Sequence, residues 1–323
     1  MQKPSLCIVT PALADANNGN WQTAQRWARL LSGHYRVSLA RQWPDAQVPD
    51  ADLLLALHAR RSATSVAAWA GTGRPLVVVL TGTDLYRDIA HDASAQRSLA
   101  LAHRLVVLQE QGLLALPPAL RPKCRVVFQS SPRRQSLPKT TAHLRAVMVG
   151  HLRDEKWPQT LFEAARLLRA DEGIRIDHIG HALDPALGEA ARQTALDCPH
   201  YRWLGGLPHA ATRQRIQRAH VLVHTSRMEG GAHVILEAVR CGTPVLASHI
   251  PGNVGMLGAG YGGYFPPGDA HALAALLRQC RTGLAAPAGR LAALQAQCEA
   301  RAPLFDPRAE QAALLAVLAE LLP

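Results

Sequence analysis

Short apolar runs alternate with amphipathic segments along the first 130 residues of the chain. Runs of four or five apolar residues are typical of strands buried on both faces, and the segments between them have apolar residues at helical spacing. The predicted elements, in chain order, are strand 6–10, helix 23–32, strand 53–57, helix 62–70, strand 76–80, helix 92–102 and strands 106–108 and 125–128. This alternation predicts a parallel sheet covered by helices.

Residues 129–141, QSSPRRQSLPKTT, are polar, contain two prolines and have no apolar period, so we interpret them as an interdomain linker. The alternation then begins again, and from residue 270 onward the pattern is almost purely helical. We interpret these residues as helices that close the second domain, with a return of the helices to the first domain as the alternative. The second set comprises strands 146–149, 174–179, 221–223 and 245–247 and helices 160–168, 186–196 and 234–239. We predict an α/β protein with two Rossmann-like domains, 1–135 and 136–323, facing across a cleft at the carboxyl ends of their strands.

Charge favours an anionic partner. The chain has 35 Lys and Arg against 24 Asp and Glu, a formal net charge of +11. Arginines are scattered and aromatic residues make up only 5%, which argues against nucleic acid and for a small anionic substrate. Six dispersed cysteines predict neither a zinc site nor a disulfide framework. No leader pattern and no apolar run of about 18 residues is present, so we expect a cytoplasmic protein with no membrane partner.

The segment SRMEGGAHVILEA, residues 226–238, follows a predicted strand and leads into a helix. Gly230 and Gly231 let backbone N–H groups approach a phosphate or a sugar at the start of that helix. Glu229 in the loop and Glu237 on the helix are acceptors suited to sugar hydroxyls. The alternative interpretation is a tight turn with one surface glutamate and one helix-face glutamate.

A second segment, VGHLRDEKWP at residues 149–158, also joins a strand to a helix. Gly150 permits a sharp exit from the strand, and Arg153 and Lys156 provide two cations where a departing diphosphate needs its charge stabilised. The alternative is an ordinary solvated helix start. Neither of these two segments offers an Asp-x-Asp pair to hold a divalent cation on a diphosphate, so we expect neither a metal nor a cofactor.

Two loops of the first domain follow strands 6–10 and 76–80. In the first, Asn18, Gly19 and Asn20 offer donors to an anion at a helix start, whereas Trp21 and Trp27 are interpreted as packing residues. In the second, TGTDLYRD at 81–88, Gly82 lies in the turn and Thr83 or Asp84 can cap the next helix. A bare capped turn is the alternative there.

Glu229 to Glu237 with the paired glycines, together with residues 150–156, resemble the retaining glycosyltransferases of family four, which have the GT-B fold. The resemblance implies an N-terminal acceptor domain and a C-terminal domain that binds a UDP-sugar. It implies that Arg153 and Lys156 grip the diphosphate, that Glu229 acts with them in catalysis, and that Glu237 takes the ribose hydroxyls. His151 stands where many relatives have arginine. The implied donor-binding residues are Gly150, Arg153, Lys156, Ser226, Glu229, Gly230, Gly231, Ala232 and Glu237.

Five blocks, ANNGNWQTAQRW, LTGTDLYRDI, VGHLRDEKWP, SRMEGGAHVILEA and IPGNVGMLG, are similar to the selenosugar synthases of selenoneine biosynthesis. This resemblance implies that selenophosphate attacks C1 of UDP-GlcNAc or a related UDP-hexose such as UDP-glucose. Because selenophosphate is already anionic, no general base is required. The implied acceptor-binding residues are Asn18, Gly19, Asn20, Trp21, Thr81, Gly82, Thr83, Asp84 and Arg87. Two alternatives stay open: an O-glycosyltransferase with a carbohydrate or lipid acceptor, and a non-catalytic nucleotide-binding module.

Overall fold

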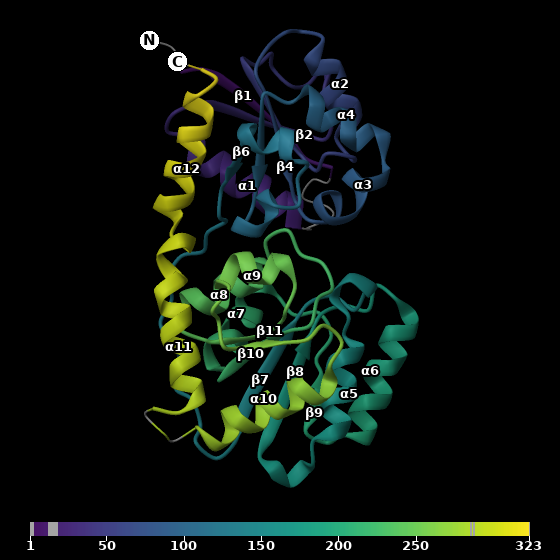
Figure 1. Ribbon diagram of the computed structural model, residues 1–323, viewed down its shortest axis with the longest axis vertical. Coiled ribbons are helices and arrows are strands. Elements are labelled where there is room, and N and C mark those ends of the chain that lie inside the picture. Colours follow the sequence, from purple (N-terminus) through teal and green to yellow (C-terminus); the bar gives the residue numbers. More distant parts are fainter. Residues whose placement is uncertain (1–2, 12–18, 285, 287, 323) are drawn as a thin grey trace. The chain divides into compact units, whose positions relative to one another are not determined.

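The computed structural model describes residues 3–11, 19–284, 286 and 288–322. The chain forms two compact units, each built on a six-stranded sheet in which all paired strands are parallel (Figure 1). The first unit comprises Met1–Ser130, Glu229–Gly231 and Leu304–Pro323, and the second comprises Ser131–Met228 and Ala232–Pro303. The predicted fold class, α/β with two parallel sheets, is confirmed.

The sheet of the first unit has the strand order β2-β1-β3-β4-β5-β6. Its strands are β1 (Ser5–Val9), β2 (Arg36–Ala40), β3 (Leu53–Leu57), β4 (Leu76–Leu80), β5 (Arg104–Val107) and β6 (Cys124–Val126). Its helices are α1 (Gly19–Leu31), α2 (Ala63–Ala70), α3 (Ile89–His91), α4 (Ala93–Leu101) and α12 (Pro307–Ala319), and a π-helical turn, η1, spans Asp84–Asp88.

Both faces of this sheet are covered, because successive side chains of a strand point to opposite sides. One face packs against α2 and α4, where Trp69 and Leu99 are buried. The other packs against α1 and α12, where Trp27 and Leu314 are buried. Strands with a core on each side need apolar residues at every position, which explains the runs LLLAL and LVVVL.

Helix α12 is distant in sequence from the rest of the first unit but completes its core, and Figure 1 shows it in yellow beside α1. Leu314, Val317 and Leu318 are buried against the sheet face that α1 covers. Glu310, 1% exposed, accepts hydrogen bonds from the side chains of Arg26 and Trp27 on α1. The first unit therefore includes residues beyond 303, which differs from the expectation of a domain ending at residue 135.

The sheet of the second unit has the strand order β12-β11-β10-β7-β8-β9. Its strands are β7 (Leu144–Val149), β8 (Ile174–Ile179), β9 (Tyr201–Trp203), β10 (Val221–His224), β11 (Val245–Ser248) and β12 (Tyr264–Phe265). Its helices are α5 (Gln159–Leu167), α6 (Pro185–Asp197), α7 (His209–Arg218), α8 (His233–Arg240), α9 (Pro251–Leu257), α10 (Ala270–Thr282) and α11 (Arg290–Arg301).

No helix in the part of the chain that the structure describes is long and apolar enough to cross a membrane. All six cysteines are buried with free thiols. Burial raises the pKa of the Cys7 and Cys280 thiols to about 11, so these side chains behave as small apolar groups.

Candidate active site

In the second unit, β7, β8 and β9 each run into a glycine within two residues of their carboxyl ends: Gly150, Gly180 and Gly205. The Gly150 amide donates to the Ile179 carbonyl at 2.9 Å, and the Gly180 amide donates to the Gly205 carbonyl at 2.8 Å. Gly180 has a φ of +156°, and a Cβ there would lie 1.9 Å from the Gly150 carbonyl oxygen. The close approach of these loops therefore requires glycine at 180, a requirement that the sequence pattern did not reveal.

Two histidines follow these glycines and stack on one another. The rings of His151 and His181 lie 5.6 Å apart, centroid to centroid, and the His181 amide donates to Nδ1 of His151 at 3.1 Å. Partial burial and the positive charges of His181, Arg153 and Lys156 lower the pKa of His151. The imidazole is thus neutral at neutral pH and adds no positive charge to this loop.

Lys156 ends a short 3₁₀ turn, η4 (Asp154–Lys156), that follows β7. Its aliphatic stem lies beside Gly150, since a Cβ on that glycine would be 3.5 Å from Lys156 Cδ. The loop after β10 holds the turn in place: the Thr225 hydroxyl donates to the Lys156 carbonyl at 2.7 Å, and the Arg227 amide donates to the Glu155 carbonyl at 2.9 Å. Lys156 is therefore positioned by two neighbouring strands of the sheet.

The side chain of Arg227 also joins the β10 loop to the Lys156 turn. Its guanidinium donates to Asp154 at 2.9 Å and lies 3.7 Å from the centroid of a Trp157 ring. Arg153 is half-exposed, with Nε 3.8 Å from a carboxylate oxygen of Glu155. The predicted cations Arg153 and Lys156 thus share one short loop at the carboxyl edge of the sheet.

Ser226, Gly230 and Ala232, three other predicted donor residues, are buried. Ser226, 1% exposed, has its hydroxyl 3.3 Å from Nε2 of His224, and its carbonyl accepts from the Ser248 hydroxyl. Ala232 is buried at the start of α8. Glu229, Gly230 and Gly231, between Ser226 and Ala232 in the sequence, group with the first unit.

Glu237 lies on α8, as predicted, with its carboxylate facing two histidines. Oε1 is 2.7 Å from Nε2 of His209 and 3.7 Å from Nδ1 of His233. Burial acts to raise the pKa of this carboxyl, but the His209 hydrogen bond and the charges of His233, His209 and Arg213 outweigh it, so the pKa is lowered. Glu237 is therefore held ionised, the state in which a carboxylate accepts hydrogen bonds from hydroxyl groups.

In the first unit, the predicted acceptor residues follow strands β1 and β4, which lie on either side of β3 in the sheet. Asn18 lies outside the described residues. Gly19, Asn20 and Trp21 form the first turn of α1, where the Thr23 hydroxyl donates to the Gly19 carbonyl at 2.8 Å. Trp27, interpreted as a packing residue, is fully buried.

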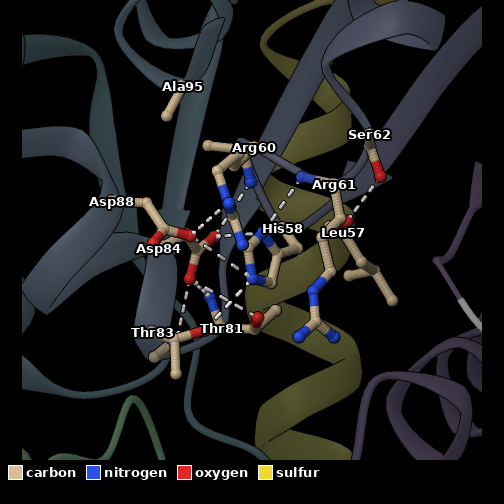
Figure 2. A network of polar contacts seen from close by, with 12 residues as sticks. Leu57, His58, Arg60, Arg61, Ser62, Thr81, Thr83, Asp84, Asp88 and Ala95 are labelled. Carbon is tan, nitrogen blue, oxygen red and sulfur yellow. Dashed lines mark hydrogen bonds and ion pairs between the residues drawn. The ribbon is translucent and has the colours of Figure 1, made fainter. Parts of the chain in front are cut away.

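Asp84 organises the loop after β4 (Figure 2). The amides of Thr81 and Gly82 both donate to its Oδ1 at 2.9 Å, and the Ala59 amide donates to Oδ2 at 2.9 Å. Because the side chain is fully buried and accepts three backbone hydrogen bonds, it joins the loop after β4 to the loop after β3. Asp84 was predicted to cap a helix or to contact the acceptor; its described contacts are those of a residue that positions Thr81 and Gly82.

His58 was not singled out from the sequence, yet it lies at the centre of this network (Figure 2). It follows β3, is 2% exposed and has a φ of +73°, an uncommon conformation for a residue with a Cβ. Nε2 is 3.1 Å from the Thr83 hydroxyl, and Nδ1 is 3.8 Å from Asp84 Oδ2. Burial lowers the pKa of His58 despite the opposing charge of Asp84. The sequence signal that could have identified His58 is a single polar residue directly after a fully apolar strand.

Two arginines lie on the outer side of the network. Arg60 and Arg87 each donate through Nε to Asp88, at 2.9 and 3.2 Å respectively. Asp88 is buried, whereas the two arginine side chains are 43% and 48% exposed. The predicted cation Arg87 is therefore joined by a second, Arg60, and both guanidiniums reach solvent beside the loop that Asp84 positions.

Residues 130–282 match the family model of group 1 glycosyl transferases. These residues carry the β7 to α10 portion of the second unit, including the Lys156 turn and Glu237. Among curated proteins, glycosyltransferase 1 domain-containing protein 1 of Xenopus tropicalis is 23% identical over 209 residues. That match covers 57% of this chain and 59% of the relative's length.

Solved structures establish the fold of the whole chain. HepE of Anabaena, solved in complex with UDP and glucose, superposes with a TM-score of 0.73 at 17% identity, covering 98% of this chain and 100% of that one. Sucrose-phosphate synthase of Thermosynechococcus elongatus gives 0.74 at 17% identity and 99% of each chain. The two parallel-sheet units are those of the GT-B fold, as the family resemblance implied. Among the residues described, no group of three or more His, Cys, Asp or Glu side chains is arranged to hold a metal ion.

Proposed function

We propose that the protein is a glycosyltransferase that transfers a hexosyl group, GlcNAc or glucose, from a UDP-sugar to selenophosphate, giving a selenosugar for selenoneine biosynthesis. The group 1 match over residues 130–282 supports the transfer of a sugar. The five sequence blocks similar to selenosugar synthases support selenophosphate as the acceptor.

The observation that carries the proposal is the fixed position of Lys156. Its turn is tied to the β10 loop through Thr225 and Arg227, so the backbone that carries the Lys156 side chain belongs to a fixed edge of the sheet. A cation held in this way stabilises charge on a leaving group without reorganising during the reaction. In the proposed roles, Lys156 and Arg153 bind the diphosphate, Glu237 accepts from the ribose, and Glu229 with the backbone of Gly230 to Ala232 contacts the sugar.

In the proposed reaction, a lone pair on selenium forms a bond to C1 while the C1–O bond to the β-phosphate breaks. The electron pair of that bond leaves on UDP, and hydrolysis of the P–Se bond then releases phosphate. No proton has to be removed from the nucleophile, so catalysis rests on positioning and on charge stabilisation. Arg60 and Arg87, half-exposed beside the Thr81–Asp84 loop, are suited to hold the acceptor's phosphate oxygens.

One observation favours a second candidate, an O-glycosyltransferase. A neutral sugar or lipid hydroxyl needs a base, and His58 is a buried imidazole with a lowered pKa whose Nε2 faces the Thr83 hydroxyl. Product analysis distinguishes the two candidates. UDP-GlcNAc with selenophosphate should release UDP, and EDTA should not lower the rate. UDP-GlcNAc with a sugar or lipid alcohol should not release UDP. Rapid UDP release with an alcohol alone would favour the second candidate.

The role of Lys156 has its own test. Lys156→Ala should lower kcat/KM at least about 100-fold, the loss typical when one charge-stabilising donor is removed. Arg192→Ala, which removes an exposed cation paired with Glu189 on α6, is the matched control and should stay within about twofold. Full activity in Lys156→Ala with an unchanged melting temperature would remove this residue from the mechanism.

A further inference from the structure

Four arginines line a cavity of about 370 Å³ in the second unit. They are Arg145 on β7, Arg202 on β9, and Arg215 and Arg218 on α7, accompanied by Ala211 and Gln214. Arg145 is the second residue of its strand, and Arg215 and Arg218 occupy the last turn of their helix. The cavity therefore lies toward the amino ends of the strands, at the opposite edge of the sheet from Gly150 and Lys156.

The strand register explains why these charges gather. Arg145 is paired with Arg175 between β7 and β8, and Asp177 is paired with Arg202 between β8 and β9. Residues two apart on a strand point to the same face, so Arg175 and Asp177 share a face with their paired residues Arg145 and Arg202. Helix α7 covers that face, because Arg215 donates to Asp177 across it at 2.9 Å.

Asp177 fixes two of the four guanidiniums. It is 2% exposed, accepts two hydrogen bonds from Arg202 at 2.9 and 2.6 Å, and accepts one from Arg215. Within the described part of the chain, no carboxylate oxygen lies within 4.0 Å of the Arg145 or Arg218 guanidinium. Four arginines against one aspartate leave three uncompensated positive charges around the cavity.

The excess positive charge also affects the pKa of a neighbouring histidine. Burial lowers the pKa of His143, and the charges of Arg175, Arg145, Arg281 and Arg202 lower it further. A field of one sign facing a concave surface raises the local concentration of the opposite ion. Guanidinium forks held in place by a buried carboxylate match phosphate oxygens in geometry as well as in charge.

We propose that this cavity is a binding site for a small soluble anion that carries two or more phosphate groups. Its volume lies within the usual range of small-molecule sites, and three surplus charges match a polyphosphorylated ligand better than a monoanion. Arg202 and Arg215 are preorganised by Asp177, and Arg145 and Arg218 supply the uncompensated charges. The site is separate from the proposed glycosyl transfer and does not depend on it.

Calorimetric titration with inorganic pyrophosphate tests this site, with saturating UDP present to occupy any donor site. The wild-type protein should bind one equivalent of pyrophosphate, with an affinity that falls as salt rises. Arg145→Gln and Arg218→Gln should each weaken binding roughly tenfold or more, and the double variant should abolish it. Arg192→Gln removes the same charge from α6 and should bind like the wild type.

Binding that is absent in the wild type, or unchanged in the double variant, overturns the proposal. Arg218 is exposed and has no described ion pair, so Arg218→Gln remains informative if the double variant fails to fold. Sedimentation with phosphatidate-containing vesicles tests whether the phosphate groups bound at this site belong to a lipid headgroup rather than to a soluble anion. Arginine-dependent vesicle binding without pyrophosphate binding would show that the ligand is a lipid headgroup, and the soluble-anion proposal would be wrong.

Discussion

Where β7 and β8 end, the backbone of one loop occupies the space that a side chain on the other would need. Gly180 lies against the Gly150 carbonyl, and its φ of +156° is unfavourable for any residue with a Cβ. The stacked pair His151 and His181 comes directly after these glycines, so the stacking geometry depends on position 180 having no Cβ.

Gly180→Ala should therefore lower the free energy of unfolding by more than about 1 kcal/mol, because both the backbone conformation and the contact are incompatible with a methyl group. Chemical denaturation measures the loss. Gly260→Ala is the control, since a Cβ there meets nothing within 4 Å and its φ is not in the left-handed region. Equal losses in the two variants would show that the close approach is not what constrains position 180.

At the residue scale, the sequence predicted which loops carry polar groups but not how those groups are used. Asp84 was identified within the loop after β4, yet one of its three backbone donors, Ala59, lies 25 residues away. His58 escaped notice because a single histidine after a strand has no spacing that marks it. Long-range partners of this kind are created by the fold and are not encoded in a local pattern.

At the scale of elements, α12 is joined to the first unit by a buried carboxylate as well as by its apolar face. Glu310 accepts from Arg26 Nε at 2.9 Å, from Trp27 Nε1 at 2.6 Å, and from the amide and hydroxyl of Ser130. These donors come from α1 and from the segment after β6, so one side chain joins three parts of the chain.

Glu310→Ala should destabilise the protein by about 3–5 kcal/mol, because it leaves the Arg26 charge and the indole N–H without their buried partner. Thermal or denaturant unfolding measures the change. Glu299→Ala removes an exposed carboxylate that pairs with Arg133, and it should cost at most about 1 kcal/mol. A loss in Glu310→Ala as small as in this control would mean that α12 is held by its apolar face alone.

Apolar runs predicted most elements well. The bounds of β3, β4 and β8 are the ones predicted, since each strand is a continuous buried run or nearly so. β2 was missed because most of its residues are only half-buried, and α7 because its sequence HAATRQRIQR buries only Thr212 and Ile216. Elements with little buried surface leave little periodic signal.

For the whole molecule, buried neutral histidines make stability depend on pH. Burial lowers the pKa of His178 to about 4, and burial together with the charge of Lys139 lowers that of His220 to about 4. The unfolded chain takes up these protons near pH 6.5 and the folded chain does not. The stabilisation is therefore complete above pH 6.5 and is lost as the pH falls from 6.5 toward 4.

We expect the free energy of unfolding to fall between pH 6.5 and 4.5, and His220→Gln to reduce that slope by about one proton. Denaturant titrations across this range measure it. His91→Gln, which changes a histidine at an exposed position, is the matched control. A His220→Gln slope identical to that of the wild type would show that His220 takes up its proton equally in the folded and unfolded chains.

The position of α12 also has a consequence for biosynthesis. A ribosome delivers β1 to β6 first, but Leu314, Val317 and Leu318 reach the nascent sheet only after the entire second unit has been translated. Until then, the face covered by α1 remains partly open to water. The hydrophobic core of the first unit is thus completed only when α12 is made, after the second unit.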